Sequence, residues 1–225
     1  MSDIIREVDE ELRRERMMKL WERYGIYVVA IAVLVVVGVG GWRVWEWYSI
    51  REAGKSSVQF EAAIALSNEG RRADSEAALN VLTKDGTSGY RLLARFRAAA
   101  ETAKADRQGG VAAYDALAAD TSLESVFRDL ARVQAALLLV DSASVAEITS
   151  RLEPLLGSSS AYRNSARELI ALSHYRAGER PAAAKRFAEI VADPDAPPAM
   201  RNRAEVMGAL LAGEMGAAAP ATATR

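Results

Sequence analysis

The chain of 225 residues is long enough for one domain of medium size and an additional segment, since domains usually contain about 100 to 200 residues. Its 29 lysines and arginines nearly balance 30 aspartates and glutamates, so no whole-molecule positive field exists to attract nucleic acid. Cysteine is absent, which excludes disulfides, thiolate nucleophiles and cysteine-ligated metals. Alanine is abundant from about residue 60 onward, and the few glycines and prolines separate periodic apolar stretches, which predicts an all-α fold.

The first segment, residues 1–23, is rich in charge, and we expect a cytoplasmic helix there. Ile5, Val8 and Leu12 follow one another at three- and four-residue spacing, so they would form one apolar stripe on this helix. Two interpretations stay open. The stripe docks a partner, or a membrane helix simply extends into the cytosol with a solvated, charged surface.

An uncharged stretch from Tyr24 to Trp42 follows, and it predicts a transmembrane helix at residues 24–47. At about 1.5 Å per residue, the apolar run covers most of a hydrocarbon layer of about 30 Å. In lipid an unsatisfied backbone group is costly, so the valine-rich run is expected to be helical despite the low helix propensity of valine. Representative positions of the span are Tyr24, Gly25, Val35, Gly38 and Trp42.

All four tryptophans flank this stretch, as is typical of side chains at a membrane interface. A buried core helix of a soluble protein would not collect its tryptophans at both ends, and a cleaved signal peptide would have a shorter leader and small residues at its cleavage site. Five basic residues crowd the N-terminal side of the stretch, against three on the other side. The N-terminus is therefore expected in the cytoplasm, with the remaining chain across the inner membrane of a bacterium, in the periplasm.

A short motif recurs along residues 48–213. Its copies begin at Tyr90, Phe127, Tyr162 and, more weakly, Met200, at spacings of 37, 35 and 38 residues. Breakers or caps follow three of these copies, and each precedes a second helical pattern: Gly109-Gly110 before Val111–Ala119, Asp141-Ser142 before Val145–Leu156, and Gly178–Pro181 before Ala182–Ala192. Each unit is predicted to be a helical hairpin, and the series an α-solenoid of the tetratricopeptide type.

The two ends of this repeat domain are expected to be irregular. Residues 49–84 or so predict a degenerate first hairpin, with apolar residues on both helices: Phe60, Ile64 and Leu66 on one, and Ala78, Leu79 and Leu82 on the next. Pro197-Pro198 predicts a last helix to about Leu211, which would cap the stack. Residues 214–225 are mainly Ala, Pro and Thr and are expected to be a disordered tail.

The sequence offers no catalytic, cofactor-binding or metal-binding residue. The single histidine, His174, has no second ligand at helical spacing, and the carboxylates lie among arginines on alanine-rich helices. Neither a Gly-rich phosphate loop nor a Ser-centred elbow accompanies them. We expect no enzymatic activity, no cofactor and no small-molecule substrate.

Recurrent arginines are the most informative polar feature. Within each unit two of them stand four residues apart and share one helix face: Arg91 and Arg95, Arg128 and Arg132, Arg163 and Arg167. One interpretation is a basic ladder that binds acidic segments of a protein partner. The other is that each arginine pairs with a neighbouring carboxylate and covers apolar surface with its stem.

The arrangement of the chain resembles a known family. A charged leader ends in RRERMMKLWERYG, one apolar span follows, the exit reads GWRVWEWY, and an alanine-rich repeat domain completes the chain. This resembles the ancillary subunit of the bacterial SecYEG translocon, most closely at Lys19-Leu20-Trp21 and Gly41-Trp42-Arg43. The resemblance implies a single-pass inner-membrane protein that associates with the Sec translocon and with periplasmic chaperones for exported chains, and it implies no catalytic residues.

Three hypotheses for function follow. The first is a non-enzymatic scaffold whose concave solenoid surface binds protein segments while the anchor raises their effective concentration at the membrane. The second is a structural adaptor of the cell envelope or division machinery, and the third is an enzyme, which a pocket with convergent polar groups would favour.

Overall fold

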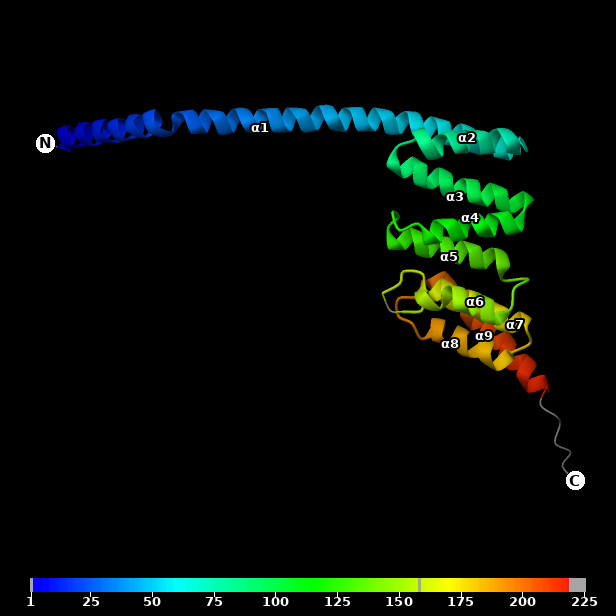
Figure 1. Cartoon of the computed structure of the whole chain (residues 1–225). Coiled ribbons are helices and arrows are strands. Elements are labelled where there is room, and N and C mark those ends of the chain that lie inside the picture. The colour runs from blue at the N-terminus through cyan, green and yellow to red at the C-terminus, as the bar shows by residue number, and fades with distance from the viewer. Residues whose placement is uncertain (1, 158, 219–225) are drawn as a thin grey trace, which may run out of the picture. The chain divides into compact units, whose positions relative to one another are not determined.

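The computed structural model describes residues 2–157 and 159–218, with the side chains of residues 17, 18, 21–27, 29–31, 33–157 and 159–216. All regular elements among these residues are helical, as predicted (Figure 1). In chain order they are α1 (Ser2–Asn68), α2 (Arg72–Asp85), α3 (Ser88–Ala105), α4 (Arg107–Ala119), α5 (Ser125–Leu139), α6 (Val145–Leu152), the 3₁₀ turn η1 (Glu153–Leu155), α7 (Arg163–Arg176), α8 (Arg180–Val191) and α9 (Pro198–Ala218). The chain divides into two compact units, residues 1–58 and 59–225.

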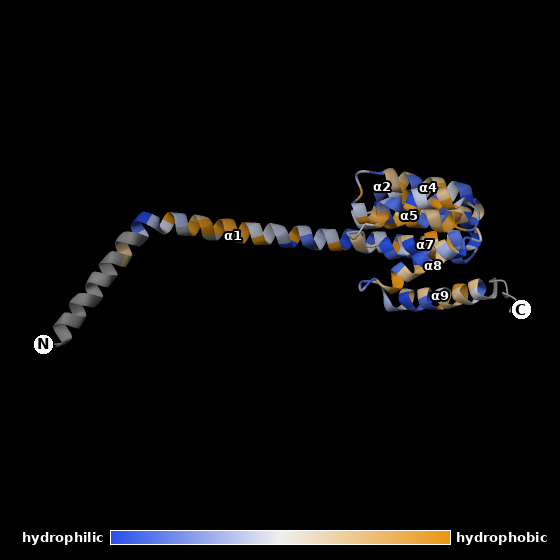
Figure 2. Cartoon of the chain, turned by 90° about the horizontal axis from the view of Figure 1, so that it is seen from below, coloured by the Kyte–Doolittle hydropathy of each residue, from blue (hydrophilic) through white to orange (hydrophobic). Residues whose placement is uncertain are grey.

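The first unit is formed by most of the long helix α1. Between Trp21 and Asn68 this helix contains a stretch that is apolar and long enough to cross a membrane, judged by length and composition (Figure 2). Only 6% of that apolar window is buried. Tyr24, Val35 and Trp42 expose more than half of their surface, while Gly25 lies against the indole ring of Trp21. The side chains of Ile5, Val8 and Leu12 lie outside the described residues, so the predicted stripe stays a prediction.

The second unit contains the repeats, and their predicted register agrees with the helices. Tyr90, Phe127 and Met200 are each the third residue of a helix, and Tyr162 directly precedes α7. The second patterns of the three full units fall on α4, on α6 with η1, and on α8. Successive helices pack side by side in antiparallel order, so the units stack as a helical solenoid (Figure 1).

The apolar core runs through this stack in three clusters. In the first hairpin, Leu79 and Leu82 of α2 pack with Phe60, as predicted, and with Ala63 of α1, whereas the predicted Ile64 and Leu66 do not belong to this cluster. The largest cluster extends from α3 to α7, and the last one centres on Phe187 between α7, α8 and α9. Small alanines at the buried positions let the helices approach closely, and one large side chain fills the remaining space.

One pair of glycines does not have the predicted role. Gly109 and Gly110 were expected to break the chain before a helix, but both lie inside α4, whose N-cap is Asp106. The Asp106 carboxylate accepts a hydrogen bond from the Gln108 backbone N–H at 3.0 Å. A Cβ atom on Gly110 would lie 2.4 Å from the Cβ of Ala103, so this glycine permits the close approach of α3 and α4.

The middle hairpin also departs from prediction. Its second helix was expected to reach Leu156, but α6 ends at Leu152 and continues as the 3₁₀ turn η1. Pro154 lies in this turn and cannot donate the backbone hydrogen bond that an α-helix requires. The second helix of this unit is therefore shorter than α4 and α8.

Two turns between paired helices have the same left-handed glycine. Gly70 has φ of 79° and Gly178 has φ of 80°, and in each turn the next residue donates its backbone N–H to a carbonyl five residues earlier. This is the hydrogen-bond pattern of a Schellman C-cap. It confirms the predicted turn at Gly178 and shows that the first hairpin, although degenerate, turns in the same way.

The last helix is longer than predicted. Helix α9 continues to Ala218, so residues 214–218, which were expected to begin the disordered tail, are helical. Residues 219–225, the rest of the predicted tail, lie outside the described residues.

Candidate protein-interaction surface

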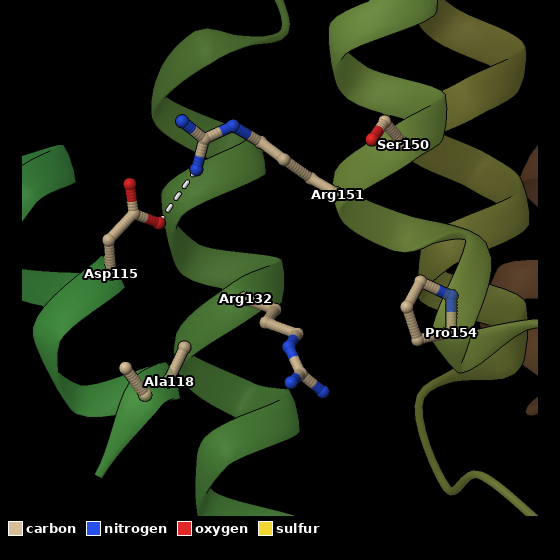
Figure 3. Close-up of a pocket in the computed structure, with 7 residues that line it drawn as sticks. Asp115, Ala118, Arg132, Ser150, Arg151 and Pro154 are labelled. Atoms are coloured by element: carbon tan, nitrogen blue, oxygen red, sulfur yellow. Dashed lines mark hydrogen bonds and ion pairs between the residues drawn. The ribbon is translucent and has the colours of Figure 1, made fainter.

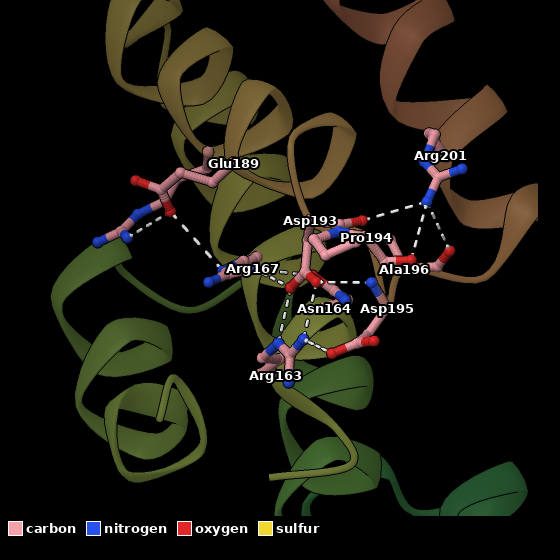
Figure 4. Close-up of polar contacts among 10 residues, drawn as sticks. Arg163, Asn164, Arg167, Glu189, Asp193, Pro194, Asp195, Ala196 and Arg201 are labelled. Atoms are coloured by element: carbon pink, nitrogen blue, oxygen red, sulfur yellow. Dashed lines mark hydrogen bonds and ion pairs between the residues drawn. The ribbon is translucent and has the colours of Figure 1, made fainter. Parts of the chain in front are cut away.

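The arginines of the last full hairpin form a polar cluster with the segment that follows α8 (Figure 4). The Asp193 carboxylate accepts hydrogen bonds from Arg163 Nε at 2.6 Å and from Arg167 Nη1 at 2.7 Å. Arg163 also pairs with Asp195 at 2.8 Å, and its side chain is only 15% exposed. Both predicted ladder arginines of this unit are thus engaged within the chain.

This cluster also fastens α9. Arg201 donates from Nη2 to the backbone carbonyls of Asp193, Pro194 and Ala196, at 3.1 to 3.3 Å (Figure 4). The pKa of the Asp193 carboxyl is lowered mainly by the hydrogen bonds from Arg163, against the opposing effect of burial. Asp193, which directly follows α8 and Ala192, therefore binds α7 through its carboxylate and α9 through its backbone carbonyl.

A related ion pair closes the α3–α4 hairpin. Arg95 Nη2 lies 2.7 Å from Asp120 Oδ2, directly after α4. Hydrogen bonds from the Ser122 hydroxyl and from Arg95 lower the pKa of Asp120 to about 2. Arg91, the other arginine of this unit, is exposed and donates to the Gly86 carbonyl at 2.9 Å.

In these two hairpins the same device recurs. An arginine on the first helix pairs with an aspartate that follows the second helix, 25 residues later for Arg95 and 26 for Arg167. We call this ion pair the hairpin clasp, made by Arg95 with Asp120 and by Arg167 with Asp193. The middle hairpin has Gly157 at the corresponding distance from Arg132 and therefore no carboxylate to complete a clasp.

Arg132 instead pairs with Asp129 of its own helix, at 2.9 Å, and its side chain stays 36% exposed. It lines a pocket of about 340 Å³ between α4, α5 and α6, together with Arg151, Ser150 and Pro154 (Figure 3). Arg151 crosses this pocket to Asp115 of α4 at 2.6 Å. Since Asp115 and Asp129 neutralise both arginines, the pocket is not a strongly basic site. The Nε atom of Arg128, the remaining ladder arginine, is buried without a hydrogen-bond partner.

Most ladder arginines thus have partners within the chain. This agrees with the second interpretation of the sequence, in which each arginine pairs with a neighbouring carboxylate. Arg95, Arg132, Arg163 and Arg167 are in ion pairs. A basic ladder that binds a partner stays a prediction.

Helix α3 contains a buried acidic residue that was not predicted from the sequence. Glu101 is 5% exposed and pairs with Arg97 at 2.7 Å and with Lys104 at 2.9 Å. Burial raises its pKa, but hydrogen bonds from Lys104 and Ser67 outweigh this effect, so the pKa is lowered on balance. Arg97 precedes Glu101 by four residues and Lys104 follows it by three, which are the spacings of helix ion pairs and the signal that identifies these residues in the sequence.

The polar groups do not converge on a catalytic arrangement in the part of the chain that the structure describes. No group of three or more His, Asp or Glu side chains suited to a metal ion occurs among those residues. The Nδ1 atom of His174 lies 2.6 Å from the Glu179 carboxylate, across the turn between α7 and α8. This contact gives the histidine a structural partner in the turn.

Stacked hairpins, alanine-lined interfaces and ion pairs between successive units define the second unit as a helical-repeat domain. The sequence profile of the tetratricopeptide repeat-like domain family matches residues 18–196. The chain belongs to this family, whose domains are typically non-enzymatic scaffolds for protein–protein interaction. The match includes the apolar part of α1 and ends before α9. Comparisons with curated proteins and with solved structures found no match.

Proposed function

We propose that this protein is a membrane-anchored scaffold for protein–protein interaction. In this proposal residues 1–23 are cytoplasmic, residues 24–47 span the inner membrane of a bacterium once, and the repeat domain at 48–213 lies in the periplasm. The observation that carries the anchor is the apolar helix α1, where the valines and tryptophans whose side chains are described expose most of their surface. Exposing this much apolar surface to water is unfavourable, and lipid removes the cost.

The repeat domain supplies the binding function. Tetratricopeptide-like units stack into an extended surface, and domains of this kind typically bind protein segments without catalysis. An anchor confines such a surface to the membrane plane, which raises the effective concentration of partners in the same membrane. Of the predicted ladder, Arg91 is the arginine that we propose for contact with acidic segments, because it is exposed and its hydrogen bond to the Gly86 carbonyl leaves its charge unpaired among the described residues.

For the identity of the partners we rely on the resemblance at the anchor. It supports the Sec translocon, the periplasmic chaperones and the newly exported chains as partners. A scaffold with these partners needs no cofactor and no small-molecule substrate.

Extraction and protease protection test the anchor and its orientation. The protein should stay in membranes through an alkaline carbonate wash, and protease added to spheroplasts should remove everything beyond about residue 50. Release by carbonate, or protection of the repeat domain in spheroplasts, would refute the proposed topology.

Photocrosslinking in intact cells tests the partners. Crosslinkers at several exposed positions of the repeat domain should recover translocon or chaperone polypeptides. Recovery of neither, together with localisation at the septum, would favour the alternative of a cell-envelope or division adaptor.

A further inference from the structure

The outer side of the last two helices carries an apolar groove. Helices α8 and α9 line a cavity of about 480 Å³, mainly with small or apolar residues such as Ala188, Gly208, Ala212 and Met215. The only charged lining residue is Glu205, an exposed carboxylate. The other flank of α9 is already occupied, because Arg203 pairs with Glu168 and Glu214 pairs with Arg180.

The repeat itself indicates what kind of element fits such a groove. Helices α4 and α5 are the second helix of one unit and the first helix of the next, as α8 and α9 are. The α4–α5 side is covered by α6, whose Arg151 reaches Asp115 of α4 (Figure 3). By this equivalence, the α8–α9 groove is the place of the second helix of the unit that α9 begins. The described residues provide no such helix.

The charge of Glu205 narrows the choice of occupant. Counting from the start of the repeat motif, Glu205 stands five residues after Met200, as Arg95, Arg132 and Arg167 stand five residues after their own motif starts. In two of those units this arginine pairs with an aspartate that follows the second helix. On α9 the charge is reversed, so the matching group on the incoming helix must be basic and must lie at its C-terminal end. A cation at that end is also favoured by the helix dipole.

We propose that the α8–α9 groove binds an amphipathic α-helix of another protein, with apolar residues at i, i+4 and i+7 and a lysine or arginine at its C-terminal end. The apolar pattern follows from α8, whose Ala183, Phe187 and Ile190 form its buried face. In a second copy of this chain, α4 and α8 are each followed by an aspartate, so either helix would place a carboxylate against Glu205. The groove therefore selects against these helices of a second copy and for a helix with the opposite terminal charge. This inference rests on the proposed scaffold function.

Two synthetic peptides test the proposal on the full chain in detergent. Both comprise residues 180–193, one with the native Asp193 and one with Asp193→Lys, and fluorescence polarisation measures their binding at up to about 1 mM. The lysine peptide should bind about five- to tenfold more tightly, and Glu205→Lys should reverse this preference. Absence of binding by the lysine peptide, or equal binding of both peptides, would overturn the proposal.

A matched pair of variants locates the binding. Gly208→Leu fills the groove, whereas Gly213→Leu adds the same side chain on the opposite side of α9, and a Cβ atom meets no atom within 4 Å at either glycine. Gly208→Leu should weaken the lysine peptide about tenfold or more, and Gly213→Leu should change its affinity less than about twofold. Circular dichroism and thermal unfolding confirm that both variants fold. Equal loss in both variants would contradict binding in the groove.

Crosslinking in cells separates this inference from the scaffold function. A crosslinker at Ala212 should capture a helical segment with the stated pattern, and Gly208→Leu should abolish that product. Partners captured elsewhere on the repeats but not at Ala212 would refute the groove and leave the scaffold standing. Capture of a second copy of this chain at Ala212 would refute the proposed occupant, and no capture at any repeat position would refute the scaffold as well.

Discussion

The last full hairpin, α7–α8, and the middle hairpin, α5–α6, start from the same arginine pair and close in different ways. In the last hairpin, the buried Asp193 carboxylate accepts hydrogen bonds from Arg163 and Arg167 and completes the clasp. In the middle hairpin Gly157 stands at the position that corresponds to the clasp aspartate, so Arg132 pairs within its own helix and a pocket stays open beside it. The same repeated residue therefore has different partners, depending on one position about 25 residues later.

The middle hairpin is held by apolar contacts instead. Ile148, Leu152 and Leu155 are each at most 1% exposed, and they close the short helix α6 and its 3₁₀ turn onto the core. The Arg151–Asp115 ion pair adds a link to the preceding unit. The hairpin shape of this repeat can therefore be stabilised either by a polar clasp or by a larger apolar contact.

The largest effect on stability is expected from substitutions in the apolar core, because each hairpin has fully buried apolar side chains. Phe187→Ala removes the largest fully buried side chain of the second unit, so it should lower the free energy of unfolding by about 3–5 kcal/mol. Leu152→Ala in the middle hairpin should cost about 2–5 kcal/mol by the same mechanism. Urea unfolding of the full chain in detergent measures both. Val206→Ala, at a side chain that is 68% exposed, is the control and should change stability by less than about 0.5 kcal/mol.

Removal of the clasp charge should affect the last hairpin more than the middle one. Asp193→Asn deprives Arg163 and Arg167 of their shared carboxylate, so the melting temperature should fall clearly. Asp129→Asn removes only an ion pair between neighbouring turns of α5 and should cause a smaller fall. Thermal unfolding by circular dichroism compares them. An equal fall in the melting temperatures of both variants would show that the clasp stabilises the chain no more than an ion pair within one helix does.

Low pH should remove the stability that the clasp aspartates contribute. The pKa of Asp120 is lowered to about 2, and that of Asp193 is lowered as well, from ordinary values near 4. A lowered pKa in the folded state contributes stability that is fully present above the unfolded-state pKa. The clasp contribution should therefore hold from pH 7 to about 4 and be lost as the pH falls from about 4 toward 2. The difference in urea midpoint between wild type and Asp193→Asn should shrink over that interval, and a constant difference would contradict the assignment.

Much of the fold was accessible from the sequence because it depends on periodicity. The recurring motif located the first helices of the units, and the apolar spacing of Phe60, Leu79 and Leu82 identified the first hairpin despite its weak pattern. The prediction failed where one residue has two possible roles. Gly110 was predicted to break a helix, but it lies inside one and allows the close approach of Ala103. This role depends on a neighbouring helix, which the local sequence does not reveal.

The arginines illustrate a second limit. Their spacing correctly placed them on one helix face, but their ion-pair partners lie 22 to 32 residues away or on the same helix. Whether an arginine reaches a distant carboxylate or one on its own helix depends on where the second helix ends. That end was misplaced in the middle hairpin, because Pro154 converts the last turn to 3₁₀. The clasp could not be predicted from the sequence, because it depends on where α4, α6 and α8 end.

A carboxylate added to the middle hairpin should complete the missing clasp, with the smallest expected effect. Gly157 has negative φ, and a Cβ atom there would meet no atom within 4 Å, so Gly157→Asp introduces no steric conflict. If the three hairpins are equivalent, the new carboxylate lies near Arg132 and should raise the free energy of unfolding by about 0.2–1 kcal/mol, as expected for a partly exposed ion pair. A double-mutant cycle with Arg132→Met isolates this interaction, because the backbone effect of replacing glycine occurs in both arms. A coupling energy of zero would mean that the proline turn directs residue 157 away from Arg132, and that the middle hairpin closes in a geometry to which the clasp cannot be transferred.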